Sequence, residues 1–371
     1  MVLGRICFAL LAMGAAMAAQ AENLRVALYN AELFRAGPGL LLRDILKGDD
    51  QVEQVAGIIA HLDPDAIVLL RFDYDLTGAA LAAFADQVAA AGSSYPHRIA
   101  LRPNTGWATG IDMDGDGRTG TPADGQSFGQ FAGQNGMAVL SKLPIATDDL
   151  RDYSDLLWRD LPGATLPQKD GAPFPSAAAL DVQRLSTVGH WEVPLRLPSG
   201  RTLRLLTFHA GPPVFDGAED RNGLRNRDEL RFWSLLLDGR IDGLAAPESP
   251  FVLVGGANVD PVGGEGLRDG IAGLLDHPAL QDPAPDSRGG ALAGQRPPRI
   301  ARHDTVAWDL PGEPGNLRVD YILPQAGLTV TGSGVFWPAG DEPDAALLGI
   351  EGRGASRHRL VWVDLDIPAG R

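Results

Sequence analysis

Short apolar runs alternate with amphipathic segments along most of the chain. Apolar and polar residues alternate at 24–28, whereas 66–70 (Ala-Ile-Val-Leu-Leu) and 251–254 (Phe-Val-Leu-Val) are apolar throughout. Continuous runs of this length are typical of strands that are buried on both faces. The remaining strands are expected at 136–140, 203–208, 318–323 and 360–367.

Between these strands the apolar residues recur at helical spacing. One predicted helix carries Val52, Val55 and Ile58 behind a possible cap at 49–50 (Asp-Asp), and it ends before 63–64 (Asp-Pro). Two more are expected at 79–91 and around 230–237, the latter after a charged loop at 216–226. Strands mixed with helices in this way predict an α/β fold.

No repeat or obvious linker interrupts this pattern, so we expect one domain over residues 22–371. The 46 glycines and 28 prolines predict long, numerous loops. The net charge of −15 repels polyanions and gives no counterion-release advantage on DNA. Nucleic acid is therefore disfavoured as a partner, although a local cationic groove on an acidic protein would still permit it.

Residues 1–21 read as a cleavable signal peptide. Arg5 precedes an apolar run at 6–18, and 19–21 (Ala-Gln-Ala) is a small-x-small cleavage site. The sequence therefore predicts export to the periplasm or secretion, with a retained N-terminal anchor as the alternative. Cys7 is the only cysteine and would be removed, which leaves no disulfide or thiol ligand. No later stretch reaches 18 apolar residues, so no membrane span is expected after cleavage.

Polar residues stand at the end of almost every predicted strand. In chain order these are 29–30 (Tyr-Asn), 72–73 (Phe-Asp), 136–141 (Gly-Met-Ala-Val-Leu-Ser), 208–209 (Phe-His), 255–261 (Gly-Gly-Ala-Asn-Val-Asp-Pro), 318–321 (Arg-Val-Asp-Tyr) and 356–359 (Ser-Arg-His-Arg). This ordered series resembles the endonuclease/exonuclease/phosphatase superfamily over nearly the whole mature chain. The stretch 212–217 (Pro-Pro-Val-Phe-Asp-Gly) resembles secreted bacterial members. The resemblance implies a two-sheet β-sandwich core flanked by helices, with a site where the loops meet at one edge.

The resemblance also assigns roles to five residues. It implies that Asn30 is the first-strand Asn of the site and that His209 is its mid-chain His. It further implies that Asn258 holds the phosphate and that Asp320 orients the final His, His358. Phosphodiester cleavage needs a cation on the non-bridging oxygens, a base for water and donors for the growing charge.

Three positions depart from the family pattern. Arg71 stands where the family has a metal-binding Glu, Gly256 replaces the Asp of Gly-Asp-x-Asn, and Arg357 replaces the Asp before the final His. Three carboxylates have become two guanidinium groups and a glycine, a local change of +5. An arginine cannot be neutralised at any relevant pH. Mg²⁺ or Mn²⁺ is therefore not expected at this site.

Two interpretations follow. In the first, the fold has lost its metal-dependent reaction, and Arg71 and Arg357 bind a phosphate-containing or other anionic small ligand. In the second, the chain is an active phosphoesterase (a nuclease or phosphatase) whose metal is held by substitute ligands. Those ligands would come from Asn30, Asp73, Asp320 or His358.

A second candidate cation site lies at 112–117 (Asp-Met-Asp-Gly-Asp-Gly). Asp112, Asp114 and Asp116 occupy positions 1, 3 and 5 of a Ca²⁺-loop pattern, and Gly117 occupies position 6. Position 12 is Ala rather than Glu, although Asp124 follows at once. The pattern predicts a structural Ca²⁺ that orders the loop at 104–134, and a plain acidic loop is the alternative.

Overall fold

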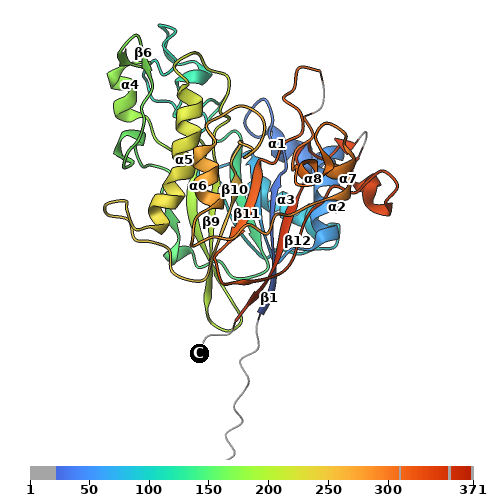
Figure 1. Cartoon of the computed structure of the whole chain (residues 1–371). Coiled ribbons are helices and arrows are strands. Elements are labelled where there is room, and N and C mark those ends of the chain that lie inside the picture. Colours follow the sequence, from blue (N-terminus) through green and yellow to red (C-terminus); the bar gives the residue numbers. More distant parts are fainter. Residues whose placement is uncertain (1–21, 309–310, 350–351, 369–371) are drawn as a thin grey trace, which may run out of the picture.

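Two β-sheets pack face to face with helices on their outer sides (Figure 1). The computed structural model describes residues 22–308, 311–349 and 352–368. The predicted fold class, a two-sheet sandwich flanked by helices, is confirmed. The predicted signal peptide at 1–21 lies outside the described residues.

The first sheet has six strands and contains both the first and the last strand of the described chain. β1 pairs parallel with β2 and antiparallel with β13, so Glu22 lies opposite Ile367. The sheet order is β12 (Thr329–Val335), β13 (Val361–Ile367), β1 (Glu22–Asn30), β2 (Ala66–Phe72), β4 (Gly136–Ser141) and β3 (His97–Ile99).

The second sheet has five strands, and β9 and β10 run parallel at its centre. Its order is β11 (Asp320–Pro324), β10 (Phe251–Gly256), β9 (Thr202–His209), β8 (His190–Arg196) and β5 (Arg151–Asp152). A separate two-stranded hairpin consists of β6 (Gln168–Lys169) and β7 (Ala172–Pro173).

Helices cover the outer face of each sheet, α1 to α3 on the six-stranded sheet and α5 and α6 on the five-stranded sheet. The α-helices are α1 (Leu40–Lys47), α2 (Asp50–Leu62), α3 (Ala79–Ala90), α4 (Ala177–Val182), α5 (Arg221–Leu237), α6 (Asp269–Leu275), α7 (Arg288–Leu292) and α8 (Pro298–Ala301). The short 3-10 helices are η1 (Pro122–Asp124), η2 (Thr147–Asp149), η3 (Trp158–Asp160) and η4 (Pro343–Leu348).

Strand side chains alternate between an inner core and an outer core. Val252 and Val254 of β10 pack between the sheets, whereas Phe251 and Leu253 pack under α5 and α6. Because both faces are buried, the strand sequence is apolar at every position. This burial explains why the central strands could be recognised from their composition.

The predicted elements agree with the structure apart from their ends. Asp49 caps α2 as expected, since its side chain accepts hydrogen bonds from the backbone N–H groups of Gln51 and Val52. The charged loop predicted at 216–226 is wrong in its second half, because α5 already begins at Arg221. The charged residues there form helix-stabilising pairs, such as Arg231 with Asp228 at 2.6 Å.

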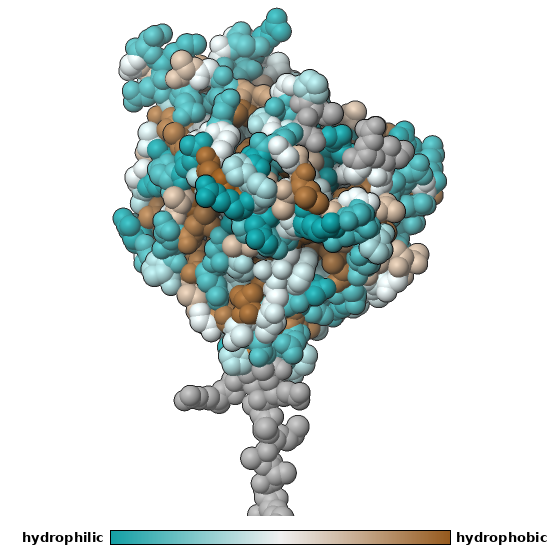
Figure 2. Space-filling model, turned by 45° about the vertical axis from the view of Figure 1, so that its right-hand side comes forward, coloured by the Kyte–Doolittle hydropathy of each residue, from teal (hydrophilic) through white to brown (hydrophobic). Residues whose placement is uncertain are grey.

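Figure 2 shows a largely hydrophilic surface with small, scattered hydrophobic patches. Within the described ranges, no helix combines the length and the apolar character needed to cross a bilayer.

Candidate functional site

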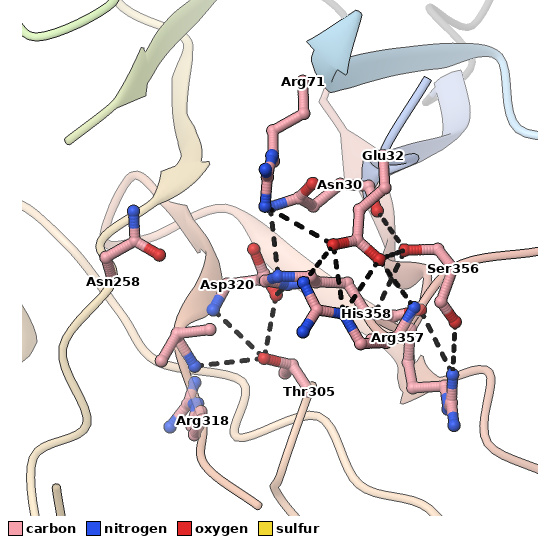
Figure 3. A network of polar contacts seen from close by, with 12 residues as sticks. Asn30, Glu32, Arg71, Asn258, Thr305, Arg318, Asp320, Ser356, Arg357 and His358 are labelled. Atoms are coloured by element: carbon pink, nitrogen blue, oxygen red, sulfur yellow. Dashed lines mark hydrogen bonds and ion pairs between the residues drawn. The ribbon is translucent and has the colours of Figure 1, made fainter. Parts of the chain in front are cut away.

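The carboxyl ends of strands from both sheets meet at one edge of the sandwich (Figure 3). Asn30 ends β1 and pairs with Leu70 of β2, while Gly256 of β10 lies between His209 and Asp320 in the second sheet. This edge is opposite the end where β1 begins. The structure therefore brings together the strand-end residues that the resemblance selected.

The imidazole of His358 lies between Asp320 and Asn30. Its Nδ1 is 2.7 Å from Oδ2 of Asp320, and its Nε2 is 3.2 Å from Nδ2 of Asn30. Because the carboxylate and the amide N–H₂ fix one acceptor and one donor, Nδ1–H donates to Asp320 and Nε2 accepts from Asn30. The hydroxyl of Thr305 also donates to Oδ2 of Asp320, at 3.0 Å. The orienting role expected of Asp320 agrees with this geometry.

Arg357 is bound to a carboxylate that the sequence analysis did not select, that of Glu32. Its Nη2 donates to Oε1 of Glu32 at 2.7 Å, and its backbone N–H donates to Oε2 at 2.9 Å. Nη1 of Arg357 reaches Glu313 at 3.0 Å, and the Ser356 hydroxyl donates to Oε2 of Glu32 at 3.2 Å. The guanidinium group therefore sits between two acids.

Arg71 approaches the same carboxylate less closely. Its Nη1 is 3.4 Å from Oε1 of Glu32, its Nε donates to Oδ1 of Asn135 at 3.2 Å, and its guanidinium lies 4.2 Å from the Phe34 ring centre. Figure 3 shows Arg71 and Arg357 both joined to Glu32. Arg71 and Arg357 therefore share one carboxylate, and Arg357 binds it at the shorter distance.

The pKa directions follow this unequal sharing. Burial alone would raise the pKa of Glu32, but the hydrogen bond from Arg357 and the positive charges around it lower that pKa to about 2. The hydrogen bond to Glu32 also raises the pKa of Arg357. For Arg71, burial and the repulsion from Arg357 outweigh the attraction of Glu32, and its pKa is lowered.

His209 and Asn258 form the other side of the site. Burial, followed by the charge of Arg71, lowers the pKa of His209 to about 3, which keeps the imidazole neutral. Nδ2 of Asn258 donates to the carbonyl of Ala210 at 2.7 Å and lies 3.5 Å from Nε2 of His209. The phosphate-holding role of Asn258 remains a prediction, and its amide donor is already engaged by the backbone.

Three residues of this edge have left-handed backbones: Glu32 (φ 51°), Arg71 (φ 55°) and Asn258 (φ 54°). At Arg71 the β2–β4 register shifts by one residue, which turns its side chain toward Glu32. Left-handed backbone at a residue with a side chain costs on the order of 1–3 kcal/mol and gathers at functional sites. Three of the nine such non-glycine residues in the described chain lie in or just after strands that end at this edge.

Gly256 leaves little room for the aspartate of the family pattern. A Cβ at this position would lie 2.8 Å from Cδ1 of Leu70 and 3.0 Å from Cδ2 of His209. The Leu70 side chain is fully buried. Restoring the carboxylate at 256 therefore requires Leu70 to move or to shrink.

These residues do not fit the metal site that the family implies. Both oxygens of Glu32 already accept hydrogen bonds from Arg357 or its neighbours. Asp73, which the sequence analysis considered as a substitute ligand, accepts from the backbone N–H groups of Asn135 and Arg35 at 3.0 and 2.7 Å. Burial raises the pKa of Asp73 to about 6. Asp73 therefore holds the loops together, which is a structural role.

The predicted Ca²⁺ loop brings its three carboxylates together. Ligand atoms of Asp112, Asp114 and Asp116 lie within 4.8 Å of one another, and no other group of three acidic, His or Cys side chains in the described segments does so. Asp124 does not join them, because its Oδ2 accepts from the backbone N–H and the hydroxyl of Thr121 at 2.8 Å. It caps η1 instead.

Glu32 is the functional residue that the sequence analysis missed. It is only two residues beyond Asn30, and the motif Tyr-Asn-Ala-Glu at 29–32 contains it. The signal was available in the charge count, because two arginines placed at one edge of the fold favour a nearby carboxylate.

Comparisons with known proteins agree with this architecture. The model of the Endonuclease/Exonuclease/phosphatase family matches residues 27–358. No curated protein matches the sequence significantly. A solved endonuclease/exonuclease/phosphatase from Beutenbergia cavernae shares 17% identity and a TM-score of 0.54, over 93% of this chain and 72% of that one.

A family protein from Leptotrichia buccalis shares 12% identity and a TM-score of 0.52, over 93% of this chain and 100% of that chain. At such identities the structural likeness supports the fold alone. The family model, in contrast, matches most of the chain, from the first strand to the final His. The chain therefore belongs to the endonuclease/exonuclease/phosphatase family.

Proposed function

We propose that this family member does not carry out metal-dependent hydrolysis and instead binds a small oxyanion-bearing ligand, with Arg71 as its main contact. The observation that carries the proposal is the ion cluster of Glu32, Arg71 and Arg357. It contains the two arginines that stand where the resemblance expects metal-binding carboxylates, and both are paired with Glu32.

Arg71 is the better placed of the two arginines for an external anion. Its one contact with Glu32 is long, at 3.4 Å, although its side chain is less exposed than that of Arg357, at 26% against 36%. Arg357 is saturated by Glu32 and Glu313. Burial, followed by the repulsion from Arg357, lowers the pKa of Arg71 despite the attraction of Glu32. A phosphate, sulfate or carboxylate group beside Arg71 would stabilise its charged guanidinium.

Glu32 and Glu313 reduce the positive potential that Arg71 and Arg357 would otherwise create. An anion therefore gains one strong charge partner rather than two, and we expect weak affinity. A dissociation constant near 1 mM corresponds to about −4 kcal/mol, which one partly buried charge-assisted contact and its neighbours can supply.

Calorimetric titration with inorganic phosphate and sulfate tests the binding. The variant Arg71→Met keeps the packing on Phe34 while removing the charge, and we expect it to abolish the signal. Arg102→Met is the matched control, because the Arg102 guanidinium lies 3.7 Å from the Trp107 ring centre, away from Glu32. If Arg71→Met binds phosphate as the wild type does, the proposal is wrong.

Hydrolysis of an aryl phosphodiester and an aryl phosphomonoester with Mg²⁺, Mn²⁺ or Ca²⁺ tests the loss of activity. We expect no turnover by the wild type. The reverting variant should combine Arg71→Glu, Gly256→Asp and Arg357→Asp with Glu32→Gln, which avoids a surplus charge. Leu70→Val makes room for the aspartate at 256. Turnover restored by these changes would identify the substitutions as the chemical cause.

An active hydrolase with substitute ligands is the second candidate. In its favour, Oδ1 of Asn30 and Oδ1 of Asp320 are buried and have no hydrogen-bond partner. Both atoms are oxygen acceptors of the kind that hard cations prefer. Wild-type turnover that EDTA abolishes, and that His358→Ala also abolishes, would support this candidate and refute the first.

We also propose that the loop of Asp112, Asp114 and Asp116 binds Ca²⁺. Its three carboxylates lie together, and each accepts a hydrogen bond from a backbone N–H group of the loop. The guanidinium group of Arg221 lies beside the loop and donates to the carbonyl of Met113. Export, which the segment 1–21 predicts, would place the loop where Ca²⁺ is plentiful. The role of the ion would be to order the loop at 104–134.

A further inference from the structure

A cavity of about 390 Å³ lies at β3, the strand of the six-stranded sheet that is farthest from β12. Its volume is within the range of ligand pockets. Two segments line it: 74–82, which leads into the first turn of α3, and 98–100, in and just after β3. We call it the β3 groove. Because β2 and β4 separate β3 from β1, the groove is a different place from the candidate site.

One wall of the β3 groove is an open sheet edge. β3 is the last strand of its sheet on this side and pairs only with β4. Within the described ranges, no strand or loop pairs with the outer side of β3. An edge strand presents backbone N–H and C=O groups there, and an extended peptide can pair with them.

The opposite wall of the groove is mainly apolar. Ala79, Leu81 and Ala82 of α3 contribute to it. Leu76, which also lines the groove, is 88% exposed. An apolar side chain that entered the groove would remove part of this surface from water, which favours binding.

Arg98 is a charged group of the groove that has no partner. Ile99 packs between the two sheets and Ala100 packs on the helix side, so the alternation along the strand directs Arg98 toward the helix side as well. Arg98 is exposed and makes no ion pair within the described part of the chain.

The acid that lines the groove, Asp75, is already engaged. Its Oδ1 accepts from the backbone N–H groups of Thr77 and Ala79, both at 3.0 Å, and its Oδ2 accepts from that of Ala80 at 2.8 Å. These donors hold the carboxylate at the start of α3, away from Arg98. The groove therefore fits a ligand that brings a carboxylate of its own.

We propose that the β3 groove binds the carboxy-terminal end of a partner protein as an added strand. The last side chain of the partner is apolar and lies in the groove, and its free α-carboxylate pairs with Arg98. A small aliphatic carboxylate would use the apolar wall and Arg98 but would leave the sheet edge unpaired, so a peptide fits better. Since β3 has only three residues, few backbone hydrogen bonds form, and we expect a dissociation constant on the order of 0.1 mM. This inference is independent of the anion binding proposed at Arg71.

Fluorescence anisotropy with the full chain and labelled hexapeptides tests the proposal. The peptides alternate Thr and Val and end in Leu, Val, Phe or Lys with a free carboxylate. We expect an apolar last residue to bind best, and its carboxy-terminal amide to bind about tenfold more weakly because it lacks the charge that pairs with Arg98. Arg98→Gln should weaken binding of the free carboxylate to the level of the amide. Arg240→Gln, which removes an exposed arginine just after α5, is the matched control and should bind as the wild type does.

Backbone methylation of the peptide separates strand addition from simple capture of a carboxylate. Only alternate N–H groups of an added strand face the sheet. Of two peptides that are N-methylated at odd or at even positions, one should therefore lose binding and the other should keep it. If both bind as tightly as the parent peptide, or if acetyl-leucine does, strand addition is wrong.

A variant that fills the groove tests its location. Ala82→Phe adds a large side chain from α3 at a partly exposed position and should exclude the peptide, while its melting temperature shows that it folds. If Ala82→Phe and Arg98→Gln both bind the peptide as the wild type does, the β3 groove is not the site. If no peptide of the series binds with a dissociation constant below about 1 mM, the proposal is wrong.

Discussion

The candidate site and the loop at 112–117 both contain carboxylates, but their surroundings differ. Glu32 is enclosed by Arg71 and Arg357, whereas Asp112, Asp114 and Asp116 face one another. A buried carboxylate that is already matched by guanidinium groups gains little from a cation, because the ion would have to displace them. Carboxylates that repel one another gain most from a cation. We therefore expect cation binding in the two regions to depend on which groups already pair with the acids.

The largest effect is expected from removing Arg357, which pairs with Glu32 in the candidate site. Arg357→Ala would remove the guanidinium group that pairs with Glu32 at 2.7 Å, and would leave the long contact to Arg71 as its remaining charged partner among the described ion pairs. The backbone N–H of residue 357 and the Ser356 hydroxyl still donate to Glu32, and we expect a loss of about 3 kcal/mol in the free energy of unfolding. Denaturant unfolding at pH 7 measures it. Arg288→Ala, which breaks the exposed pair with Asp341, is the control and should change stability little. Equal losses of stability in Arg357→Ala and Arg288→Ala would mean that the pairing of Glu32 stabilises the fold no more than an exposed ion pair does.

Acid should weaken the cluster because the folded-state pKa of Glu32 is about 2, below its ordinary 4.5. The stabilisation is fully present above pH 4.5 and is lost as the pH falls through 2, and its full size is about 3 kcal/mol. The pKa of His209 is about 3, below its ordinary 6.5, so protonation of His209 also destabilises the folded state as the pH falls. The test is therefore the difference between wild type and Glu32→Gln at pH 6 and pH 3. A difference that does not shrink at pH 3 would contradict the pairing.

Gly256→Ala tests the packing beneath the cluster. The added Cβ would meet Leu70 at 2.8 Å, and we expect the overpacking to cost about 1–3 kcal/mol. Thermal unfolding measures the loss. The double variant Gly256→Ala with Leu70→Val should recover part of the lost stability. If the double variant is no more stable than Gly256→Ala, the clash with Leu70 is not the cause of the loss.

Calcium should have the smallest effect, at the other acidic region. With a dissociation constant near 1 mM, as in extracellular modules, 10 mM Ca²⁺ would stabilise the fold by about 1.4 kcal/mol. The melting temperature with Ca²⁺ and with Mg²⁺ measures this effect, and Asp112→Asn with Asp114→Asn should remove it. No response of the wild type to Ca²⁺ would leave the segment as a plain acidic loop.

Much of the fold could be predicted from particular segments. The runs at 66–70 and 251–254 are strands because only strands buried on both faces require apolar residues at every position. Short elements such as β3, β5 and α4 could not be predicted, since each has too few residues to show a period. The start of α5 at Arg221 was missed because its first turn contains Asn222 and Gly223, which are weak helix formers, and has no side-chain cap.

The sequence alone determined the family, and its resemblance to that family predicted which strand ends carry the site and that Arg71, Gly256 and Arg357 depart from the family pattern. These follow from the order of strand-end motifs, which is a local property of the chain. The tertiary structure decided that Arg71 and Arg357 share Glu32. Glu32 and Arg357 are 325 residues apart in the chain. A charge so distant in sequence gives no local pattern, and only the meeting of β1 with the segment before β13 pairs the two groups.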